Sequence, residues 1–162
     1  MPSFIGWVPT PDERIENFFD LAPLSSSDVV YDLGSGDGRL LFAALEKGAG
    51  RAVGVELDPE RVKLAREEAK SKGLEDRVTF LEADVMNINL ADASVVLCYM
   101  SSKASEALKP KLEAELKPGT RVVMESFSVP GWKPIQTTTG TDMGFCGYIE
   151  FYLYIMPPES TE

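Results

Sequence analysis

The chain has 162 residues, of which 44% are hydrophobic, and this length fits one compact domain with a buried core but no separate substrate domain. Sixteen Lys and Arg side chains stand against 26 Asp and Glu, so the net charge is −10, and histidine is absent. The negative charge disfavours nucleic acid as a partner, and the absence of histidine excludes a Ser-His-Asp triad, a Cys-His pair and histidine metal ligands.

The apolar runs and the cysteines of the sequence also predict the compartment in which the protein works. No apolar run approaches the roughly 18 residues of a membrane span, and residues 1–10 lack the basic and apolar regions of a secretion signal. Cys98 and Cys146 stand in apolar, strand-like contexts without Cys or His at metal spacing. These features predict free thiols in a reducing cytoplasm, no metal ion and no membrane contact, and we expect a monomer.

The first quarter of the chain alternates helical and strand patterns. A capping box at residues 10–13 precedes a helical pattern that ends near Ala22. The apolar run at 28–33 predicts the first core strand, and a glycine-rich turn leads from it into a second helix that includes Leu45. The second strand is predicted at 51–57, which completes the first strand–helix–strand unit.

The same alternation continues through the middle of the chain. Asp58 predicts the cap of a third helix, which ends at Gly73. Apolar runs at 77–83 and 93–99 predict the third and fourth strands.

The last third begins with a helical pattern at 101–116 that is interrupted by Pro110, and this proline predicts the opening of a second helix there. A fifth strand is predicted at 121–127. The segment from 137 onward is rich in strand-forming residues and predicts a terminal hairpin with its last strand at 148–156.

Strands that alternate with helices predict right-handed crossover units and a parallel sheet covered on both faces. We therefore expect an α/β, Rossmann-like, doubly wound sheet in one domain, with residues 1–27 as a helical segment and 28–162 as the core. In such sheets ligands bind at the carboxyl ends of the strands, so the residues that follow each strand are the candidate site.

The strongest site signal follows the first predicted strand. That strand ends in Asp32 and turns through Gly-x-Gly-x-Gly into a helix, which lets a ligand approach the backbone closely. A dinucleotide fingerprint counted from the first of these glycines would need a further glycine where Arg39 stands. An acid beside the turn suits an amino group or a sulfonium better than a pyrophosphate. The turn residues predicted to bind the cofactor are Gly34, Ser35, Gly36 and Gly38.

Two further strands also end in acids. Glu56 ends the second strand, where a carboxylate can accept hydrogen bonds from both hydroxyls of a ribose. Asp84 follows the third strand and is assigned to the exocyclic amine of adenine, although Glu82 lies on the same face two residues earlier. The adjoining Leu57 and Val85 complete the predicted cofactor contacts. A lone carboxylate at a strand end is usually a turn residue or a cap, but three successive ones with a glycine turn predict a site.

These residues resemble the class I, seven-stranded S-adenosylmethionine-dependent methyltransferases. A closer resemblance is to the small archaeal protein-lysine methyltransferases, which are similar to mitochondrial lysine methyltransferases and, more distantly, to the non-SET histone lysine methyltransferases. The segments that carry it are residues 7–11, 30–39, 53–56, 108–113, 116–123 and 131–132.

The resemblance implies a fold and a cofactor. The implied strand order is 3-2-1-4-5-7-6 with strand 7 antiparallel, and the implied cofactor is S-adenosylmethionine, without a metal ion. In that group a Tyr-x-x-Thr contacts the methionine end of the cofactor; here Trp7 stands in place of the tyrosine, and Thr10 matches the threonine. An indole donates one hydrogen bond but cannot accept one as a phenol oxygen does, and Thr10 also fits the helix cap.

The resemblance implies methyl transfer to lysine ε-amines of protein substrates. A lysine must lose its proton before it attacks, because its reference pKa is about 10.4. Water, desolvation of the amine, Tyr99 or Glu125 can serve this step, and the last two are the candidate catalytic residues. Tyr99, Phe127 and Trp132 are candidates for an aromatic wall around a cationic side chain, with packing as the alternative role.

Three hypotheses for the function remain open on the sequence. The leading one is a protein-lysine N-methyltransferase, because an Asn-Pro-Pro-Tyr-like segment typical of enzymes that methylate base or amide nitrogens is absent after the fourth strand. The second is methylation of a small molecule or RNA, and the third is a non-catalytic S-adenosylmethionine-binding module. The first hypothesis includes self-methylation at the lysines that we expect to be exposed, Lys63, Lys70, Lys72 and Lys103.

Overall fold

The computed structural model describes residues 10, 12–141 and 148–161. Trp7, Cys146 and the proline of the capping box lie outside the described residues. The helices are α1 (Asp12–Leu21), α2 (Arg39–Glu46), α3 (Pro59–Ser71), α4 (Ser102–Glu115) and the short 3₁₀ helix η1 (Val85–Asn87). The strands are β1 (Val29–Leu33), β2 (Arg51–Glu56), β3 (Val78–Glu82), β4 (Val95–Tyr99), β5 (Arg121–Glu125), β6 (Trp132–Lys133), β7 (Gln136–Thr141), β8 (Tyr148–Ile155) and β9 (Glu159–Ser160).

Seven of these strands form one sheet in the order β3-β2-β1-β4-β5-β8-β7. The pairings from β3 to β5 are parallel, and β8 runs antiparallel to both β5 and β7. Since β7 and β8 are the sixth and seventh strands of this sheet along the chain, the order predicted from the resemblance is confirmed. The short strands β6 and β9 pair with each other in a separate ribbon.

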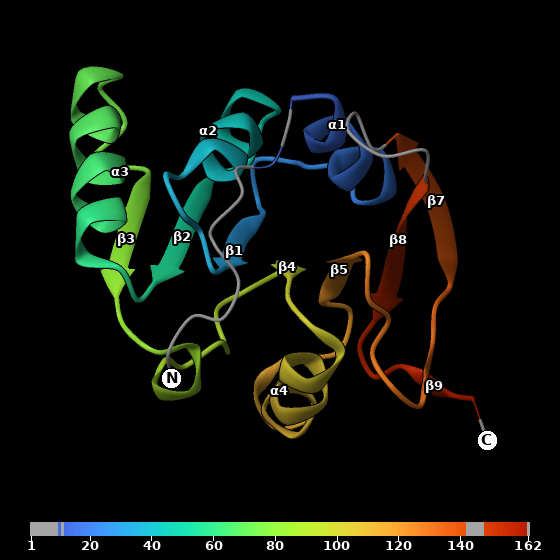
Figure 1. Ribbon diagram of the computed structural model, residues 1–162. Helices are drawn as coiled ribbons and strands as arrows, with labels where there is room; N and C mark the ends of the chain where they lie inside the picture. Colours follow the sequence, from blue (N-terminus) through green and yellow to red (C-terminus); the bar gives the residue numbers. More distant parts are fainter. Residues whose placement is uncertain (1–9, 11, 142–147, 162) are drawn as a thin grey trace.

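Helices cover the sheet on both sides (Figure 1). On one face, side chains of α1, α2 and α3 pack on the sheet in a core that includes Phe18, Leu41 and Phe151. On the other face α4 packs over a second core that includes Leu112 and Tyr154. Burial of each large apolar side chain contributes about 1.5–3 kcal/mol, so the two cores fix the helices against the sheet. Among the described residues, no helix is both long and apolar enough to cross a lipid bilayer.

The prediction of two helices around Pro110 is wrong, because α4 continues through it. A proline in a helix removes one N–H, which leaves the carbonyl four residues earlier, that of Glu106, without its helical donor. Pro110 and Glu106 are both exposed, and water can serve that carbonyl. Leu108 and Leu112, one on either side of the proline, remain buried against the sheet and hold the helix together.

Several predicted strand ends also differ by one or two residues from the observed ones, and the structure gives a reason at two of them. The fifth strand ends at Glu125 rather than at residue 127, because Ser126 has a φ of 69° and turns the chain out of the sheet. The first strand begins at Val29, the first residue in register with β2, and the side chain of Asp28 just before it joins a polar network. The terminal hairpin is confirmed as β7 and β8.

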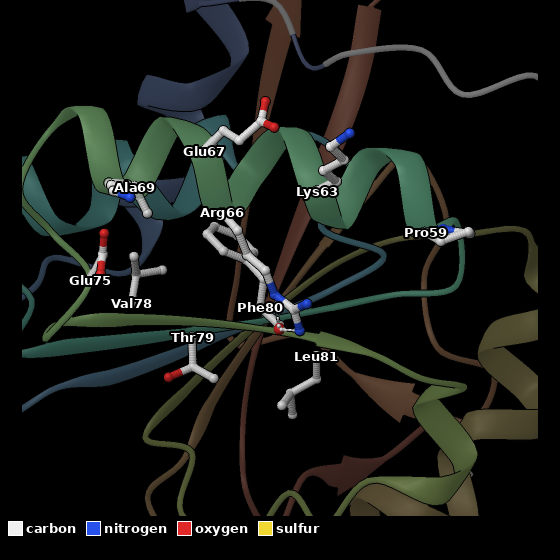
Figure 2. Close-up of a pocket in the computed structure, with 11 residues that line it drawn as sticks. Pro59, Lys63, Arg66, Glu67, Ala69, Glu75, Val78, Thr79, Phe80 and Leu81 are labelled. Carbon is white, nitrogen blue, oxygen red and sulfur yellow. Dashed lines mark hydrogen bonds between the residues drawn. The ribbon is translucent and has the colours of Figure 1, made fainter.

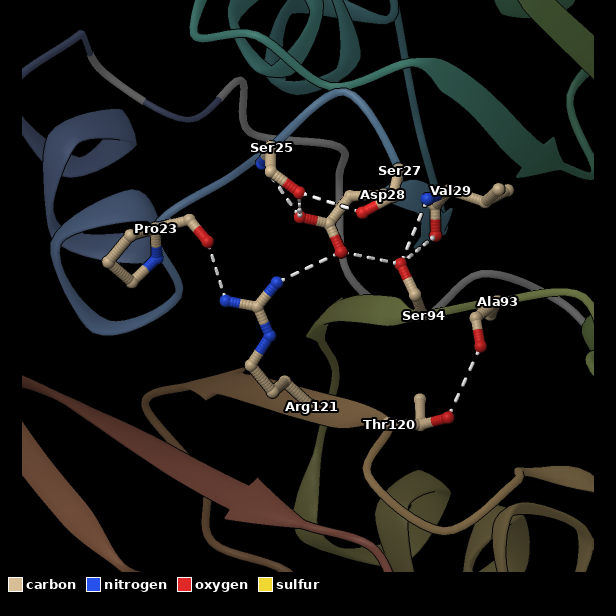
Figure 3. Close-up of polar contacts among 9 residues, drawn as sticks. All are labelled: Pro23, Ser25, Ser27, Asp28, Val29, Ala93, Ser94, Thr120 and Arg121. Carbon is tan, nitrogen blue, oxygen red and sulfur yellow. Dashed lines mark hydrogen bonds and ion pairs between the residues drawn. The ribbon is translucent and has the colours of Figure 1, made fainter.

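Asp28 joins three segments at the edge of the sheet where β1, β4 and β5 begin (Figure 3). Its Oδ2 accepts a hydrogen bond from the amide of Ser25 at 2.8 Å, and its Oδ1 accepts from the hydroxyl of Ser94 at 2.8 Å and from Arg121 Nη2 at 3.0 Å. Burial raises the pKa of this carboxyl, but the hydrogen bonds and the guanidinium outweigh burial, and the net pKa lies below the ordinary value.

Asp28→Asn is expected to destabilise the fold by about 2–3 kcal/mol. The substitution removes the charged acceptor, and the new amide NH2 group would face N–H and O–H groups that themselves need an acceptor. Because the folded-state pKa of Asp28 is lowered, its stabilisation is present above the unfolded pKa near 3.8 and is lost as the pH falls through the folded value. Urea unfolding at pH 7 and pH 3 measures both effects. Asp92→Asn, at an exposed ion pair with Arg51, is the control and should change stability by less than about 0.5 kcal/mol. Equal losses in the two variants would contradict this assignment.

Candidate functional site

The glycine turn between β1 and α2 is anchored on β2. The amides of Gly34 and Ser35 both donate to the carbonyl of Val55, at 2.8 and 3.0 Å. Gly38 has a φ of 86°, and a Cβ there would lie 2.6 Å from a ring carbon of Phe80, so the turn requires glycine at this position. At Gly34, by contrast, a Cβ would meet nothing within 4 Å. The exposed side of the turn therefore has room for a ligand.

The side chain of Ser35 lies under this turn and not on its exposed side. Its Oγ would be 2.6 Å from a Cβ on Gly54 of β2, and this oxygen is buried without a hydrogen-bond partner among the described residues. Ser35 is therefore positioned to shape the turn, while its backbone belongs to the predicted cofactor surface.

Glu56, at the end of β2, holds the turn from the side. Its Oε1 accepts from the amide of Gly36 at 3.0 Å and its Oε2 accepts from the amide of Asp58 at 3.0 Å, while Nη1 of Arg61 lies 3.7 Å from Oε1. The carboxylate is buried. A carboxylate oxygen can accept two hydrogen bonds, so Glu56 can hold the turn and also accept from ribose hydroxyls.

Asp32 is buried at the carboxyl end of β1, between β2 and β4. Burial, together with the negative charges of Glu56, Glu125 and Asp37, raises its pKa to about 7. Like charges that converge on a buried carboxylate favour a cation beside it. This environment matches the amino group or sulfonium that the sequence predicted for this position.

The end of β3 offers the polar and apolar groups expected around a purine. Asp84 caps η1, with its Oδ1 accepting from the amide of Met86 at 2.9 Å, and Glu82 is exposed on the strand before it. Val85 is half-buried, while Leu57 and Met86 are both more than half exposed. Exposed apolar side chains beside a carboxylate suit the ring faces and the exocyclic amine of adenine.

Tyr99 and Glu125 end adjacent strands and face each other in register. Tyr99 is 48% exposed, but Glu125 is only 1% exposed and accepts from Arg14 Nη1 of α1 at 2.8 Å. Burial raises the pKa of Glu125, and the guanidinium partly offsets this effect. Of the two candidate catalytic residues, only Tyr99 presents a substantial surface to solvent.

For Trp132 the structure shows the packing role that the sequence left open beside the aromatic wall. Its ring is buried against Tyr154 with ring centroids 5.4 Å apart, and its Nε1 donates to Glu113 Oε1 of α4 at 2.8 Å. These contacts place it in the core on the α4 side. Phe127 and Tyr99 are both exposed near the ends of β5 and β4 and remain candidates for the acceptor side of the site.

Arg39 links the segment before α1 to the glycine turn. Its guanidinium forms an ion pair with Asp37 at 2.7 Å and donates through Nη1 to the carbonyl of Thr10 at 3.3 Å. Thr10 therefore lies close to the start of α2, and its contact with the cofactor stays a prediction, while Trp7 is outside the described residues.

A groove of about 620 Å³ runs between α3 and β3 (Figure 2). Arg66 reaches across it and donates to the carbonyl of Phe80 at 2.7 Å. The groove contains none of the predicted cofactor residues. It is therefore separate from the carboxyl edge of β1 and β2.

The arrangement fits S-adenosylmethionine. It combines an open glycine turn, a buried acid that suits a cation, a second acid that suits hydroxyls, and a third acid beside exposed apolar side chains; these acids are Asp32, Glu56 and Asp84. Within residues 12–141 and 148–161, no group of three or more acidic or thiol side chains is arranged to hold a metal ion.

Comparison with known proteins identifies the family. The model of the ANTKMT methyltransferase domain matches residues 32–136. The chain belongs to this methyltransferase family. It is 36% identical over 153 residues to a protein-lysine N-methyltransferase of Saccharolobus islandicus, with 94% of each chain covered. The resemblance to archaeal protein-lysine methyltransferases is therefore confirmed.

Two further relatives extend the comparison. The methyltransferase is 35% identical over 139 residues to the mouse adenine nucleotide translocase lysine N-methyltransferase, and this match spans 85% of the chain but only 60% of the mouse protein. A crystal structure described as an RNA methyltransferase from Salinibacter ruber, in complex with S-adenosylhomocysteine, superposes with a TM-score of 0.85 at 37% identity. That match covers 96% of this chain and 97% of the other.

Sequence reasoning missed the contacts that join α1 to the site. The Arg14–Glu125 ion pair spans 111 residues, and the Arg39–Thr10 hydrogen bond spans 29. An arginine on a helix is usually a surface residue. No local pattern shows which partners Arg14 and Arg39 take, because these partners are brought close only in the folded chain.

Glu56→Ala should weaken binding of S-adenosylmethionine by about 10- to 100-fold, because a charged acceptor is lost at about 1.5–3 kcal/mol. Glu56→Gln keeps one acceptor oxygen and should lose less affinity. Titration calorimetry measures both, with NAD as a ligand that should not bind. Wild-type affinity in a folded Glu56→Ala variant would show that this carboxylate only supports the turn.

Affinity for S-adenosylmethionine should rise with pH through about 7, because Asp32 becomes charged there and then attracts the cationic cofactor. Calorimetry between pH 5.5 and 8.5 measures the dependence. Asp32→Asn should bind more weakly and with a flatter profile. A pH dependence that survives this substitution unchanged would assign the titration to another group.

Proposed function

We propose that this methyltransferase transfers the methyl group of S-adenosylmethionine to lysine ε-amino groups of protein substrates. The observation that carries the proposal is the 36% identity, across 94% of both chains, to a protein-lysine N-methyltransferase. Lysine methyltransferases are also among the mammalian relatives at 33–35% identity. The chain covers little more than half of those proteins' lengths, so their particular substrates are not assigned to it.

The residues of the carboxyl edge are assigned to hold the cofactor. Asp32 faces its cationic end, Glu56 accepts from the ribose hydroxyls, and Asp84 accepts from the adenine amine beside Leu57 and Val85. The cofactor would supply a methyl group bonded to a sulfonium sulfur, and the neutral thioether that remains after methyl transfer is a good leaving group. The protein's contribution is therefore mainly alignment of donor and acceptor.

The acceptor amine must reach the site without its proton. Tyr99 is the exposed polar side chain at the end of β4 and lines the approach of the amine. Glu125 is held by Arg14, so we assign it a charge-setting role instead of a proton transfer. Desolvation at this edge lowers the pKa of the incoming lysine, and solvent then takes its proton.

The charge of the chain favours cationic partners. At −10, the protein attracts lysine-rich proteins and repels the phosphates of nucleic acids. We further propose that it acts as a monomer in the cytoplasm without a metal ion or a membrane partner. The buried thiol of Cys98, which is unpaired, fits a reducing compartment.

RNA is the second candidate substrate. The Salinibacter ruber protein that superposes on this chain is described as an RNA methyltransferase. The chain's negative charge opposes this activity, because RNA binding depends on neutralising phosphates with Lys and Arg. The two candidates are separated by where the methyl group is found.

Incubation with tritiated S-adenosylmethionine and separate protein, RNA and metabolite extracts should label protein. Mass spectrometry should place the methyl groups on lysine ε-amines, including exposed lysines of the enzyme itself such as Lys63, Lys70, Lys72 and Lys103. The initial rate should climb with pH to about 8–9, because more of the amine is neutral there. Added salt should slow the reaction by screening the attraction to basic substrates.

Asp32→Asn serves as the control with impaired cofactor binding and should lose labelling of all fractions. Methyl groups confined to RNA would establish the second candidate, and methyl groups confined to metabolites would indicate a small-molecule enzyme. Cofactor binding with no labelled fraction at all would leave a non-catalytic binding module.

A further inference from the structure

Among the described residues, no helix covers one face of the carboxyl-terminal hairpin. The pairing of β7 with β8 sets Thr139 opposite Glu150 and Thr137 opposite Tyr152. Because side chains alternate along a strand, the residues on this face are Thr137, Thr139, Tyr148, Glu150 and Tyr152, which we call the hairpin face.

Burial decreases steadily along this face of β8. Tyr154, the next residue on the same side, is fully buried and packs against Trp132 in the α4 core. Tyr152 is half-buried, Glu150 is exposed, and Tyr148 is 81% exposed. A tyrosine this exposed at the start of a strand contributes little to folding, because most of its ring stays in water.

The opposite face of the hairpin is covered by α1. Phe18 packs edge-on against Phe151 with ring centroids 5.0 Å apart, and a Cβ on Gly140 would lie 2.6 Å from Nδ2 of Asn17. Figure 1 shows α1 beside β7 and β8, and α4 beside β4 and β5. In the part of the chain that the structure describes, the open face of the hairpin is therefore the one on the α4 side of the sheet.

The hairpin face borders the candidate site. Since β8 runs antiparallel to β5, its first residues lie beside the carboxyl end of β5, where Glu125 pairs with Phe151. The amide of Ser126 donates to the carbonyl of Glu150 at 2.7 Å, and the exposed Phe127 follows directly. On the other side, Glu125 is in register with Tyr99. The hairpin face, Phe127 and Tyr99 thus lie along one edge of the sheet.

This part of the chain carries negative charge only. Residues 134–162 contain four acids and no Lys or Arg. On the hairpin face, the carboxylate of Glu150 accepts a hydrogen bond from the hydroxyl of Tyr152. That bond, together with burial and the charge of Glu150, raises the pKa of Tyr152 to about 12, so the phenol stays the donor in this bond.

We propose that the hairpin face, with Phe127, docks the basic segment that flanks the acceptor lysine of a protein substrate. The inference rests on the proposed function and adds the surface that recognises the substrate. Aromatic rings at Tyr148 and Phe127 contact the stems and charged groups of flanking Lys or Arg side chains. Glu150 provides the opposite charge. A second copy of the chain would bring the same acidic face against this one, which like-charge repulsion disfavours.

The test uses two synthetic peptides with one acceptor lysine, flanked by arginines in the first and by glutamates in the second. Wild-type enzyme should methylate the arginine-flanked peptide with the lower KM. Tyr148→Ala and Glu150→Gln should each raise that KM by about 5- to 10-fold, the loss of one cation–π or charge contact. The kcat and the calorimetric Kd for S-adenosylmethionine should stay within about twofold of wild type, since neither residue belongs to the cofactor site.

The matched controls lie on α3, next to the opposite edge of the sheet. Leu64 is an exposed apolar side chain, 57% accessible, and Glu67 is an exposed acid. Leu64→Ala and Glu67→Gln should leave the KM for both peptides unchanged. Glu150→Gln preserves the acceptor for Tyr152, so a change in KM reports the lost charge and not a disrupted strand.

Fluorescence anisotropy with the labelled arginine-flanked peptide and S-adenosylhomocysteine gives a readout independent of activity. The same two variants should weaken peptide binding by the same factors. Unchanged KM and unchanged peptide affinity would overturn the docking assignment while leaving lysine methylation intact. A Tyr148→Ala variant that shifts a dimer to monomers in sedimentation, with unchanged KM, would assign the face to self-association and also overturn it. Absence of lysine methylation by the wild type would instead contradict the proposed function.

Discussion

The carboxylate of Glu56 is the contact on which the geometry of the site depends. One oxygen fixes the amide of Gly36 in the glycine turn and the other fixes the amide of Asp58, the cap of α3. A single side chain at the end of β2 therefore sets the position of two helix starts. The turn can be rich in glycine and still be ordered, because its donors are satisfied by a buried charged acceptor and by the carbonyl of Val55.

Concentrating acids at this edge has an electrostatic cost that the fold offsets only in part. The negative charge of Asp32 is unfavourable in this environment, as its raised pKa shows. The charge of Glu125 is partly balanced by its ion pair with Arg14 of α1. A buried carboxylate without a cation is destabilising until a ligand provides one. The carboxyl edge of the sheet, where we propose that the cofactor binds, is thus electrostatically less favourable than the opposite edge, where Asp28 accepts from Ser25, Ser94 and Arg121.

Sequence reasoning predicted the sheet and the acids well, because both follow from local patterns. Apolar runs that alternate with helical spacing define a parallel sheet, and the strand order followed from the resemblance. The carboxylates at 32, 56 and 84 could be placed because a strand end is visible in the sequence. Sequence reasoning failed at Pro110, where the helix continues because the helix face that carries the proline is solvated. It left the role of Trp132 open, because the indole is buried by contacts with α4, where Glu113 accepts its hydrogen bond.

The contact between Arg66 and the Phe80 carbonyl bears on how the molecule behaves in a crowded solution. β3 is the last strand on its side of the sheet, and the bonds from Ala52 to Arg77 and from Ala83 to Glu56 leave the Phe80 carbonyl directed outward. An outward carbonyl on a terminal strand is a template on which another chain can add a strand. The guanidinium occupies this acceptor through two of its nitrogens and places a positive charge beside it. The sheet is thereby protected at that margin against edge-to-edge aggregation.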